Sequence, residues 1–451
     1  MKTGEVNIKS YPEKYWLVTA DMGYGHQRAI YPLRDLSVRG EILSANASPV
    51  ASLKEQRLWN KIRNAYELMS RAGRLPILGR FVSLILDNLL YIPSFYPRRD
   101  SSASTLQVRY LKYVIKKGLC SGFLHQTDGT DHPVVTSFYA PAIASDIKGK
   151  QPVYCIICDT DLHRVWVSEN AASSRIVYFA PGTTAARRLE SYGVPEQNIL
   201  ITGFPLPPEL LGGRDLKILK ENLALRLGNL DPDGSFTNLY RHTVDAYLPE
   251  YRDIQSQNPH RSGALTITFV TGGAGAQKEI GKQIVQSIAQ EIISGRVRIN
   301  LVAGTRKELL DYFKAVKEDI VAGSDYLNII WEENIDLYFR SFNSCLHKTD
   351  ILWTKPSELS FYCALGLPVI LTPAIGPQEK CNRKWLREIG AGLKQQNPEY
   401  TSQWLFDLLR KGRLAEAAWN GFIKARKYGT YNITDFLKSG SFNSSNHPLA
   451  R

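Results

Sequence analysis

Residues 264–292 read ALTITFVTGGAGAQKEIGKQIVQSIAQEI, and this stretch decides the fold. A buried-strand pattern runs into Gly272, Gly273 and Gly275, and a helix pattern follows at once. Glycines let a backbone approach phosphate oxygens, and a helix start offers free N–H groups and the positive end of the helix dipole. The sequence therefore predicts a phosphate-binding loop, with a tight packing turn as the alternative. The loop matches neither a full GxGxxG pattern nor a Walker loop.

The order of strand, loop and helix recurs along the chain. It appears at 14–37 (KYWLVTADMGYGHQRAIYPLRDLS), at 174–194 (SRIVYFAPGTTAARRLESYGV) and at 297–320 (VRINLVAGTRKELLDYFKAVKEDI). Two such series predict the α/β class, with two doubly wound, Rossmann-like domains. We expect an N-terminal domain at 1–209, a linker with an insertion at 210–262, a second domain at 263–420, and a helix with a disordered tail at 421–451.

Length and charge narrow the possible partners. A chain of 451 residues is long enough for two or three domains. Its 56 Lys and Arg against 43 Asp and Glu give a net charge of +13, which suits a phosphorylated ligand or an anionic lipid surface. Nucleic acid is not expected, because the basic excess lacks an RNA-type aromatic signature. No apolar run of signal-peptide or membrane-spanning type is present in the sequence, so we expect a cytoplasmic protein.

The segment 53–97 mixes basic residues with Leu, Trp, Tyr and Ile. Asp87, Asn88 and Pro93 interrupt its apolar part, so it is too polar to span a bilayer but suited to lie in a membrane interface. We expect peripheral association with an anionic membrane, with an ordinary packed helical pair as the alternative.

A second glycine loop, ADMGYGHQRA at 20–29, carries Asp21, Gly23, Gly25 and His26 between the first strand and its helix. A histidine at such a place suits a general base that takes a proton from a substrate hydroxyl. A helix-capping or solvent-facing histidine is the alternative.

Two short patterns in the first domain allow more than one interpretation. Residues 159–161 spell DTD, which suits Mg²⁺ or a strand-end turn with a helix cap, and we expect no metal there. His163 and Trp166 follow closely and predict a polar and aromatic rim. Cys155 and Cys158 form a CxxC motif, but residues three apart in a strand face opposite sides. We therefore expect buried core cysteines rather than a metal or redox pair.

These pieces occur together in the order of a known family. They are MGYGH at 22–26, DTDLHRVW at 159–166, YFAPGTTAARRLESYGVPEQNILITGFPLPP at 178–208, TGGAGAQ at 271–277, and the run from TKPSEL to CNRKWLREIGAG at 354–392. The chain resembles glycosyltransferase family 28, of the GT-B fold. Its pattern is similar to those of monogalactosyldiacylglycerol synthases, bacterial diacylglycerol glucosyltransferases and, more distantly, the peptidoglycan N-acetylglucosaminyltransferase. The resemblance covers most of the chain outside 53–130 and 230–262.

The resemblance implies two domains that face a cleft, with a nucleotide-sugar donor (a UDP-sugar) on the C-terminal domain and a lipid acceptor on the N-terminal domain. The residues it implies on the donor side are Gly272, Gly273, Ala274, Gly275, Gln378, Glu379 and Asn382. It implies that His26 is the base, and it places Asp161 on the acceptor side, where we also expect Gly23, Gly25, His163 and Trp166. Arg306, which follows a buried strand, suits a phosphate contact or plain solvation.

One position departs from the family pattern. The family has a glutamate about seven residues before the proline of GLP, where it holds the nucleotide ribose, and this chain has Phe361 there. Glu358 lies three residues earlier, about one helical turn away, and we expect it to take that role from a shifted frame.

The resulting hypothesis is an inverting, metal-independent hexosyltransferase that needs no cofactor. His26 would act as the base, oriented by Asp21 or Asp161. The 272–276 loop and Arg306 would stabilise the departing diphosphate. Two alternatives stay open: a nucleotide-sugar-binding protein of the same fold without transferase activity, and a sugar-nucleotide epimerase.

Overall fold

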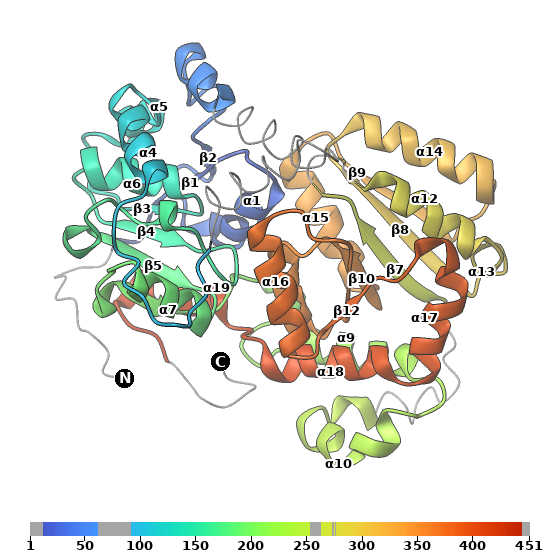
Figure 1. Ribbon diagram of the computed structural model, residues 1–451. Coiled ribbons are helices and arrows are strands. Elements are labelled where there is room, and N and C mark those ends of the chain that lie inside the picture. Colours follow the sequence, from blue (N-terminus) through green and yellow to red (C-terminus); the bar gives the residue numbers. More distant parts are fainter. Residues whose placement is uncertain (1–11, 62–91, 253–262, 273–274, 276, 444–451) are drawn as a thin grey trace.

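The computed structural model describes residues 12–61, 92–252, 263–272, 275 and 277–443. Within these ranges the chain forms two α/β halves that lie side by side (Figure 1). Each half holds a six-stranded sheet, and every pair of neighbouring strands in both sheets is parallel. The predicted fold class, two doubly wound Rossmann-like domains, is therefore confirmed.

The N-terminal sheet has the strand order β2, β1, β3, β4, β5, β6. Its strands are β1 Trp16–Thr19, β2 Leu43–Ser44, β3 Val134–Thr136, β4 Val153–Ile156, β5 Ile176–Ala180 and β6 Ile199–Ile201. The helices of this half include α1 Tyr24–Ile30, α4 Leu106–Lys116, α5 Ser121–Thr127, α6 Tyr139–Lys148 and α7 Thr183–Ser191, with the 3₁₀ turns η1 Tyr31–Leu36 and η2 Arg164–Trp166, and residues 53–61 are also helical.

The C-terminal sheet has the order β12, β11, β10, β7, β8, β9. Its strands are β7 Leu265–Val270, β8 Val297–Gly304, β9 Leu327–Trp331, β10 Ile351–Thr354, β11 Val369–Leu371 and β12 Gly392–Lys394. Its helices are α12 Lys278–Ser287, α13 Ala289–Ile293, α14 Lys307–Val321, α15 Ile335–Leu346, α16 Pro377–Glu388 and α17 Thr401–Arg410, with the 3₁₀ turn η5 Glu358–Leu365.

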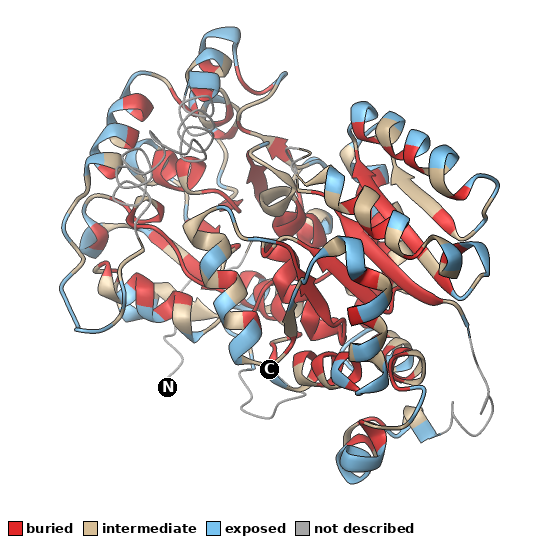
Figure 2. Ribbon diagram, turned by 45° about the vertical axis from the view of Figure 1, so that its right-hand side comes forward, coloured by how far each residue is buried: buried red, intermediate tan, exposed pale blue. Residues whose placement is uncertain are grey.

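The period-two alternation of the strands builds two apolar layers in the N-terminal half. Tyr15 and Leu17 face the layer that is continuous with the C-terminal core, whereas Trp16 and Val18 face the opposite layer. Figure 2 shows the central strands of both sheets buried, with exposed residues on the outer faces of the helices, whereas the edge strands β6, β9 and β12 are partly exposed. The same alternation separates the two cysteines of the CxxC motif, because Cys155 belongs to one layer and Cys158 to the other. Both are buried free thiols, as expected of core cysteines.

The residues predicted as a linker with an insertion are largely helical in their described part: α8 Pro208–Leu211 ends in them, and they contain α9 Lys217–Leu230 and α10 Thr237–Tyr247. Helix α9 packs into the C-terminal core through its leucines. Its buried Arg226 donates to the carbonyl oxygens of Thr349, Leu365 and Gly366 at 2.8–3.1 Å. This helix is therefore part of the second domain's core.

The chain crosses between the halves a second time near its end. Helix α18 Arg413–Lys424 packs on η5 in the C-terminal half, and α19 Gly429–Ser439 returns to the N-terminal half. There the ring of Phe436 lies 6.1 Å from Tyr154 and 5.8 Å from Phe179, between ring centroids. Asn432 donates to the carbonyl oxygen of Thr202 at 2.8 Å.

Each sheet has one point at which the strand order reverses, between β1 and β3 and between β7 and β10. Ligands of doubly wound sheets bind at the carboxyl ends of the strands beside such points. The two glycine loops follow β1 and β7, so both begin at such a point. No helix built from the described residues is long and apolar enough to cross a bilayer.

Candidate active site

The first glycine loop joins β1 to α1. Gly23 lies at the helix N-cap with φ 114°, a backbone angle that favours glycine. Helix α1 starts at Tyr24, so Gly25 and His26 lie in its first turn at the boundary between the halves.

His26 is held by the N-terminal half. Its Nδ1 lies 2.9 Å from the carbonyl oxygen of Ser137, so Nδ1–H donates and the lone pair of the neutral ring stays on Nε2. The ring is half-buried against Phe138, with centroids 4.7 Å apart, and against Trp166 at 6.0 Å. Burial lowers the pKa of His26 to about 4, and the Ser137 hydrogen bond and the charge of Glu358 act in the opposite direction. The imidazole is therefore neutral at physiological pH, with its lone pair on Nε2.

The carboxylates predicted to orient His26 have other partners. Asp21 is exposed and accepts a hydrogen bond from Gln27 at 3.0 Å. Asp161 accepts two hydrogen bonds from the buried guanidinium of Arg188, at 2.8 and 2.9 Å. A backbone carbonyl holds the ring in place of either aspartate.

The predicted polar and aromatic rim is buried. His163 and Trp166 are only 3% exposed. Trp166 belongs to an aromatic cluster with Phe138, Tyr139 and His26. The apolar surroundings that these rings provide explain why burial lowers the pKa of His26.

Helix α1 contacts the loop after β8, helix α15 and the turn η5 of the C-terminal half. The Tyr24 hydroxyl accepts a hydrogen bond from the Thr305 amide at 2.9 Å and lies 3.0 Å from the Thr305 hydroxyl. The buried guanidinium of Arg28 forms an ion pair with Glu358 and donates to the Tyr338 hydroxyl at 2.9 Å. Tyr24 and Arg28 are four residues apart, so both lie on one face of α1.

Glu358 reaches the first glycine loop. A Cβ atom on Gly25 would lie 2.7 Å from Glu358 Oε2, so the carboxylate packs directly on this glycine. The residue expected to hold a ribose thus forms its ion pair with Arg28 of the other half. Phe361 is buried and stacks on Phe204 of the connecting segment, with centroids 4.8 Å apart, so it brings no polar group to that place.

The second glycine loop follows β7, and its residues 273 and 274 lie outside the described part of the chain. Gly272 lies against Lys355, since a Cβ atom there would come within 2.9 Å of the lysine Cδ. Gly275 has φ 65°, which favours glycine. Arg306 is the N-cap residue of α14. Lys355, which follows β10, therefore lies beside the glycine turn that is expected to bind phosphate.

Helix α16 carries three of the residues expected on the donor side. Gln378 and Glu379 lie in its first turn. Glu379 pairs with Lys355 at 2.9 Å and accepts from the Ile375 amide at 2.7 Å. This pair places a cation and an anion at the edge of the second glycine loop.

Asn382 joins the two halves. Its side-chain oxygen accepts from the Thr160 amide and hydroxyl, both at 2.9 Å. Its side-chain nitrogen donates to Asp159 at 2.8 Å and to the carbonyl oxygen of Pro356 at 3.2 Å. The residue is fully buried, and all the hydrogen-bonding groups of its amide are in use. Burial raises the pKa of Asp159 to about 6, while the hydrogen bond from Asn382 acts against this.

Sequence reasoning missed four groups that build this region: the carbonyl of Ser137 and the side chains of Tyr24, Arg28 and Lys355. The i, i+4 spacing of Tyr24 and Arg28 was a signal for a shared helix face. A backbone carbonyl such as that of Ser137 leaves no trace in the side-chain pattern. Within the described ranges, no group of three or more His, Cys, Asp or Glu side chains is arranged to hold a metal ion.

Comparison with known proteins supports the resemblance. Over 245 residues the chain is 23% identical to a processive diacylglycerol beta-glucosyltransferase of Bacillus subtilis (strain 168), which is 54% of this chain and 50% of that protein. A protein of the same name from Bacillus pumilus (strain SAFR-032) is 22% identical over 247 residues, again 54% of this chain and 50% of the relative. The chain thus matches about half the length of these curated relatives. The resemblance to diacylglycerol glucosyltransferases predicted from the motifs is confirmed.

No family model matches the chain. Among solved structures, the MnaA–UDP co-structure from S. aureus has a TM-score of 0.47 at 13% identity and covers 95% of this chain and 96% of its own. The crystal structure of MurG from Acinetobacter baumannii has a TM-score of 0.42 at 13% identity and covers 94% and 99%.

Proposed function

We propose that this protein is an inverting glycosyltransferase that moves a hexose from a UDP-sugar to a membrane-lipid acceptor. The observation that carries the proposal is the state of His26: a neutral ring with Nδ1–H fixed on Ser137 and Nε2 free to accept a proton, at the boundary of two doubly wound domains. Two glycine loops that begin at the switch points of the two sheets support it, as does the similarity to diacylglycerol glucosyltransferases.

In the proposed reaction, each group of the site has a defined role. The acceptor hydroxyl oxygen bonds to the anomeric carbon from the face opposite the leaving group, and the bond from that carbon to the diphosphate breaks. Nε2 of His26 takes the hydroxyl proton, and the UDP leaves with the bonding electron pair. The negative charge of Glu358 stabilises the imidazolium that forms. Lys355, beside Gly272, and the start of α12 stabilise the charge of the leaving diphosphate.

A transfer assay tests this function. The full chain is incubated with radiolabelled UDP-glucose, UDP-galactose or UDP-N-acetylglucosamine and with vesicles that contain diacylglycerol. We expect a labelled glycolipid from at least one donor. We also expect a roughly 10²–10⁴-fold lower kcat for His26→Gln, because the proton acceptor is lost. His125→Gln, at an exposed histidine of α5, is the matched control and should keep wild-type activity. Full activity of His26→Gln contradicts the assignment of the base.

The lipid acceptor is supported by one surface of the N-terminal half. Leu106, Tyr110 and Tyr113 lie on one face of α4 and are 73%, 58% and 56% exposed. Arg109, Lys116 and Lys117 are exposed around them. Exposed aromatic and apolar side chains among cations suit an anionic membrane interface.

Vesicle sedimentation measures this docking. We expect the protein to bind vesicles that contain phosphatidylglycerol and to bind pure phosphatidylcholine weakly. Tyr110→Ser with Tyr113→Ser should reduce the bound fraction several-fold without changing the melting temperature, because both rings are exposed. Tyr400→Ser, at a 54% exposed tyrosine of the C-terminal half, is the control. Equal binding of the double variant and the wild type would count against an α4 docking face.

A second candidate, a UDP-sugar-binding protein without transferase activity, is favoured by the partners of Asn382 and Glu358. Both residues are expected on the donor side, and both direct their polar groups to the N-terminal half. A rise in melting temperature with UDP-sugar, together with no labelled product from any donor, would select this function instead.

A further inference from the structure

A cavity of about 200 Å³ lies between the two halves, beside the Thr160–Asn382 contact. Its walls come from both halves: Thr160, Pro181, Gly182, Thr183 and Thr184 on one side, and Phe361, Trp385, Lys424, Ala425 and Arg426 on the other. Pro181 and Gly182 follow β5 directly, so the cavity lies at the carboxyl edge of the N-terminal sheet, where such sheets bind ligands. The proposed transfer reaction uses none of these side chains.

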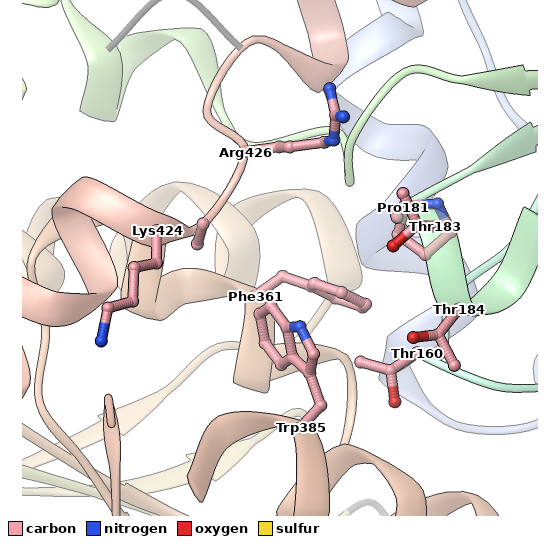
Figure 3. Close-up of a pocket in the computed structure, with 10 residues that line it drawn as sticks. Thr160, Pro181, Thr183, Thr184, Phe361, Trp385, Lys424 and Arg426 are labelled. Atoms are coloured by element: carbon pink, nitrogen blue, oxygen red, sulfur yellow. The ribbon is translucent and has the colours of Figure 1, made fainter. Parts of the chain in front are cut away.

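One wall is aromatic. Phe361 and Trp385 lie with their ring centroids 5.3 Å apart, and Figure 3 shows them facing the threonines across the gap. Phe361 is fixed from behind by its stack on Phe204. A sugar ring carries C–H groups on its faces, and these pack well on aromatic rings.

The facing wall is polar. Thr183 and Thr184 begin α7, and the N-cap residue Gly182 has no side chain that could bond to the first N–H groups. These N–H groups and the two hydroxyls therefore point to a ligand with hydroxyl and phosphate oxygens. Arg426 adds positive charge to the rim, whereas the Lys424 ammonium points away in Figure 3 and donates to the carbonyl oxygen of Ile389 at 2.9 Å.

The size of the cavity decides between ligand classes. Sites for drug-sized ligands usually enclose about 300–1,000 Å³. At about 200 Å³ this cavity is too small for a nucleotide sugar and suits one sugar ring with one phosphate.

The walls also couple the cavity to domain closure. A ligand between them contacts both halves and so binds the closed arrangement in preference to an open one. Thr160 lines the cavity and donates to Asn382 through its amide and its hydroxyl. We propose that the cavity between α7 and α16 is a regulatory site for a monosaccharide phosphate, and that its occupancy stabilises the closed arrangement of the two halves.

Calorimetric titration of the full chain tests the site. The probes are glucose 1-phosphate, glucose, inorganic phosphate and UDP. We expect glucose 1-phosphate to bind more tightly than glucose or phosphate alone. Trp385→Leu and Thr184→Val should each raise its Kd by about 10-fold or more. Trp331→Leu, at a half-buried tryptophan of β9, is the control and should leave the Kd unchanged. Thr184 is half-buried and its substitution fills no space, so this variant keeps the test valid if Trp385→Leu does not fold.

Hydrogen exchange measures whether ligand binding in the cavity is coupled to closure of the two halves. Glucose 1-phosphate should slow exchange of the Thr160 amide in wild type, because closure keeps it bonded to Asn382. Three results would overturn the proposal: no binding of glucose 1-phosphate, equal binding by wild type and both cavity variants, or binding of UDP alone with the same dependence on Trp385. The binding does not require transferase activity. His26→Gln should therefore bind glucose 1-phosphate normally even if no glycolipid is ever formed.

Discussion

The imidazole of His26 experiences two opposite influences on its pKa. Burial against aromatic rings favours the neutral form, whereas the Ser137 carbonyl and the charge of Glu358 favour the protonated form. Burial prevails, and the pKa falls from 6.5 to about 4. A base of this kind keeps its lone pair across the physiological pH range. The negative charge of Glu358 stabilises the ring only after the ring has taken up a proton.

This pKa predicts the pH dependence of stability. The folded pKa of His26 is depressed, so between about pH 6.5 and 4 the unfolded chain binds a proton that the folded chain refuses. Because of His26, the unfolding free energy should therefore rise as the pH rises from about 4 to 6.5, and this contribution is lost as the pH falls through this window. Asp159 acts in the opposite direction, since its folded pKa is raised to about 6, so wild type alone would show a partly cancelled slope.

Comparison with His26→Gln isolates the histidine, because Asp159 is present in both proteins. Urea unfolding at pH 4, 5, 6 and 7 should show the stability of wild type relative to the variant increasing with pH up to about 6.5 and then levelling off. A difference that stays constant from pH 4 to 7 would mean that His26 has an ordinary pKa.

The sequence predicts His26 correctly as a polar residue in the first turn of α1, but it does not predict the atom that orients it. The pattern offers Asp21 and Asp161, because carboxylates near a histidine are its usual partners. In the fold Asp161 meets Arg188, and Asp21 faces solvent. Partners that come from 27 or more residues away, or from the backbone, are set by tertiary packing and leave no local pattern.

Helix α1 meets the turn η5 through a glycine. Gly25 has no side chain, and the Glu358 carboxylate fills the space that a Cβ atom would occupy. The glycine is required here by close approach and not by its backbone angles. The same element pair carries the Arg28–Glu358 ion pair, so α1 and the start of η5 are matched in shape and charge.

Gly25→Ala should therefore separate α1 from η5. Its Cβ would lie 2.7 Å from Glu358 Oε2, and the carboxylate is buried with Arg28 and cannot easily move. We expect a loss of about 1–3 kcal/mol in unfolding free energy, measured in urea. Gly263→Ala, where nothing lies within 4 Å of the added atom, should change stability by less than about 0.5 kcal/mol. A Gly25→Ala protein as stable as wild type would mean that Glu358 has room to withdraw.

At the level of elements the sequence predicts well where the hydrophobic period is long. The units at 264–292 and 297–320 form β7 with α12 and β8 with α14, although the helix expected through residue 292 is divided at Ile288 into α12 and α13. The shift of Glu358 is less predictable. In the sequence, Glu358 lies one turn from the position at which the family has its ribose-binding glutamate. Its partner in the ion pair, Arg28, is 330 residues away along the chain, so no local pattern indicates the pair.

The two halves are joined by buried polar groups as well as by a continuous apolar core. Arg28 crosses the boundary to Glu358 and Tyr338, and Asn382 crosses it to Asp159 and Thr160. Such contacts stabilise only the closed arrangement. Their loss on opening would leave charged groups to be solvated or re-paired.

A double-mutant cycle measures this closure. Arg28→Met alone leaves Glu358 buried without its cation and should cost roughly 3–5 kcal/mol, and Glu358→Leu alone should cost a similar amount. The combined variant should cost clearly less than their sum, since no buried charge is left unpaired. Additive losses would indicate that the two side chains are not coupled. Small-angle scattering should show a larger radius of gyration for each single variant than for wild type, because the closed arrangement is weakened.

The division into two α/β domains could be predicted from the sequence because it rests on repeated local units. The return of α19 to the N-terminal half could not, because the helix has the same local pattern wherever it packs. Its partners Tyr154 and Phe179 precede it by more than 250 positions.

That return has a consequence for biosynthesis. Tyr154 and Phe179 lie under Phe436, so the first half to leave the ribosome cannot cover its apolar surface until residues 429–439 have been translated. Domains usually fold as they emerge, N-terminal first. Here the nascent N-terminal half must wait through the synthesis of the whole second half with part of its core open, and this interval is when a chaperone would matter most to the chain.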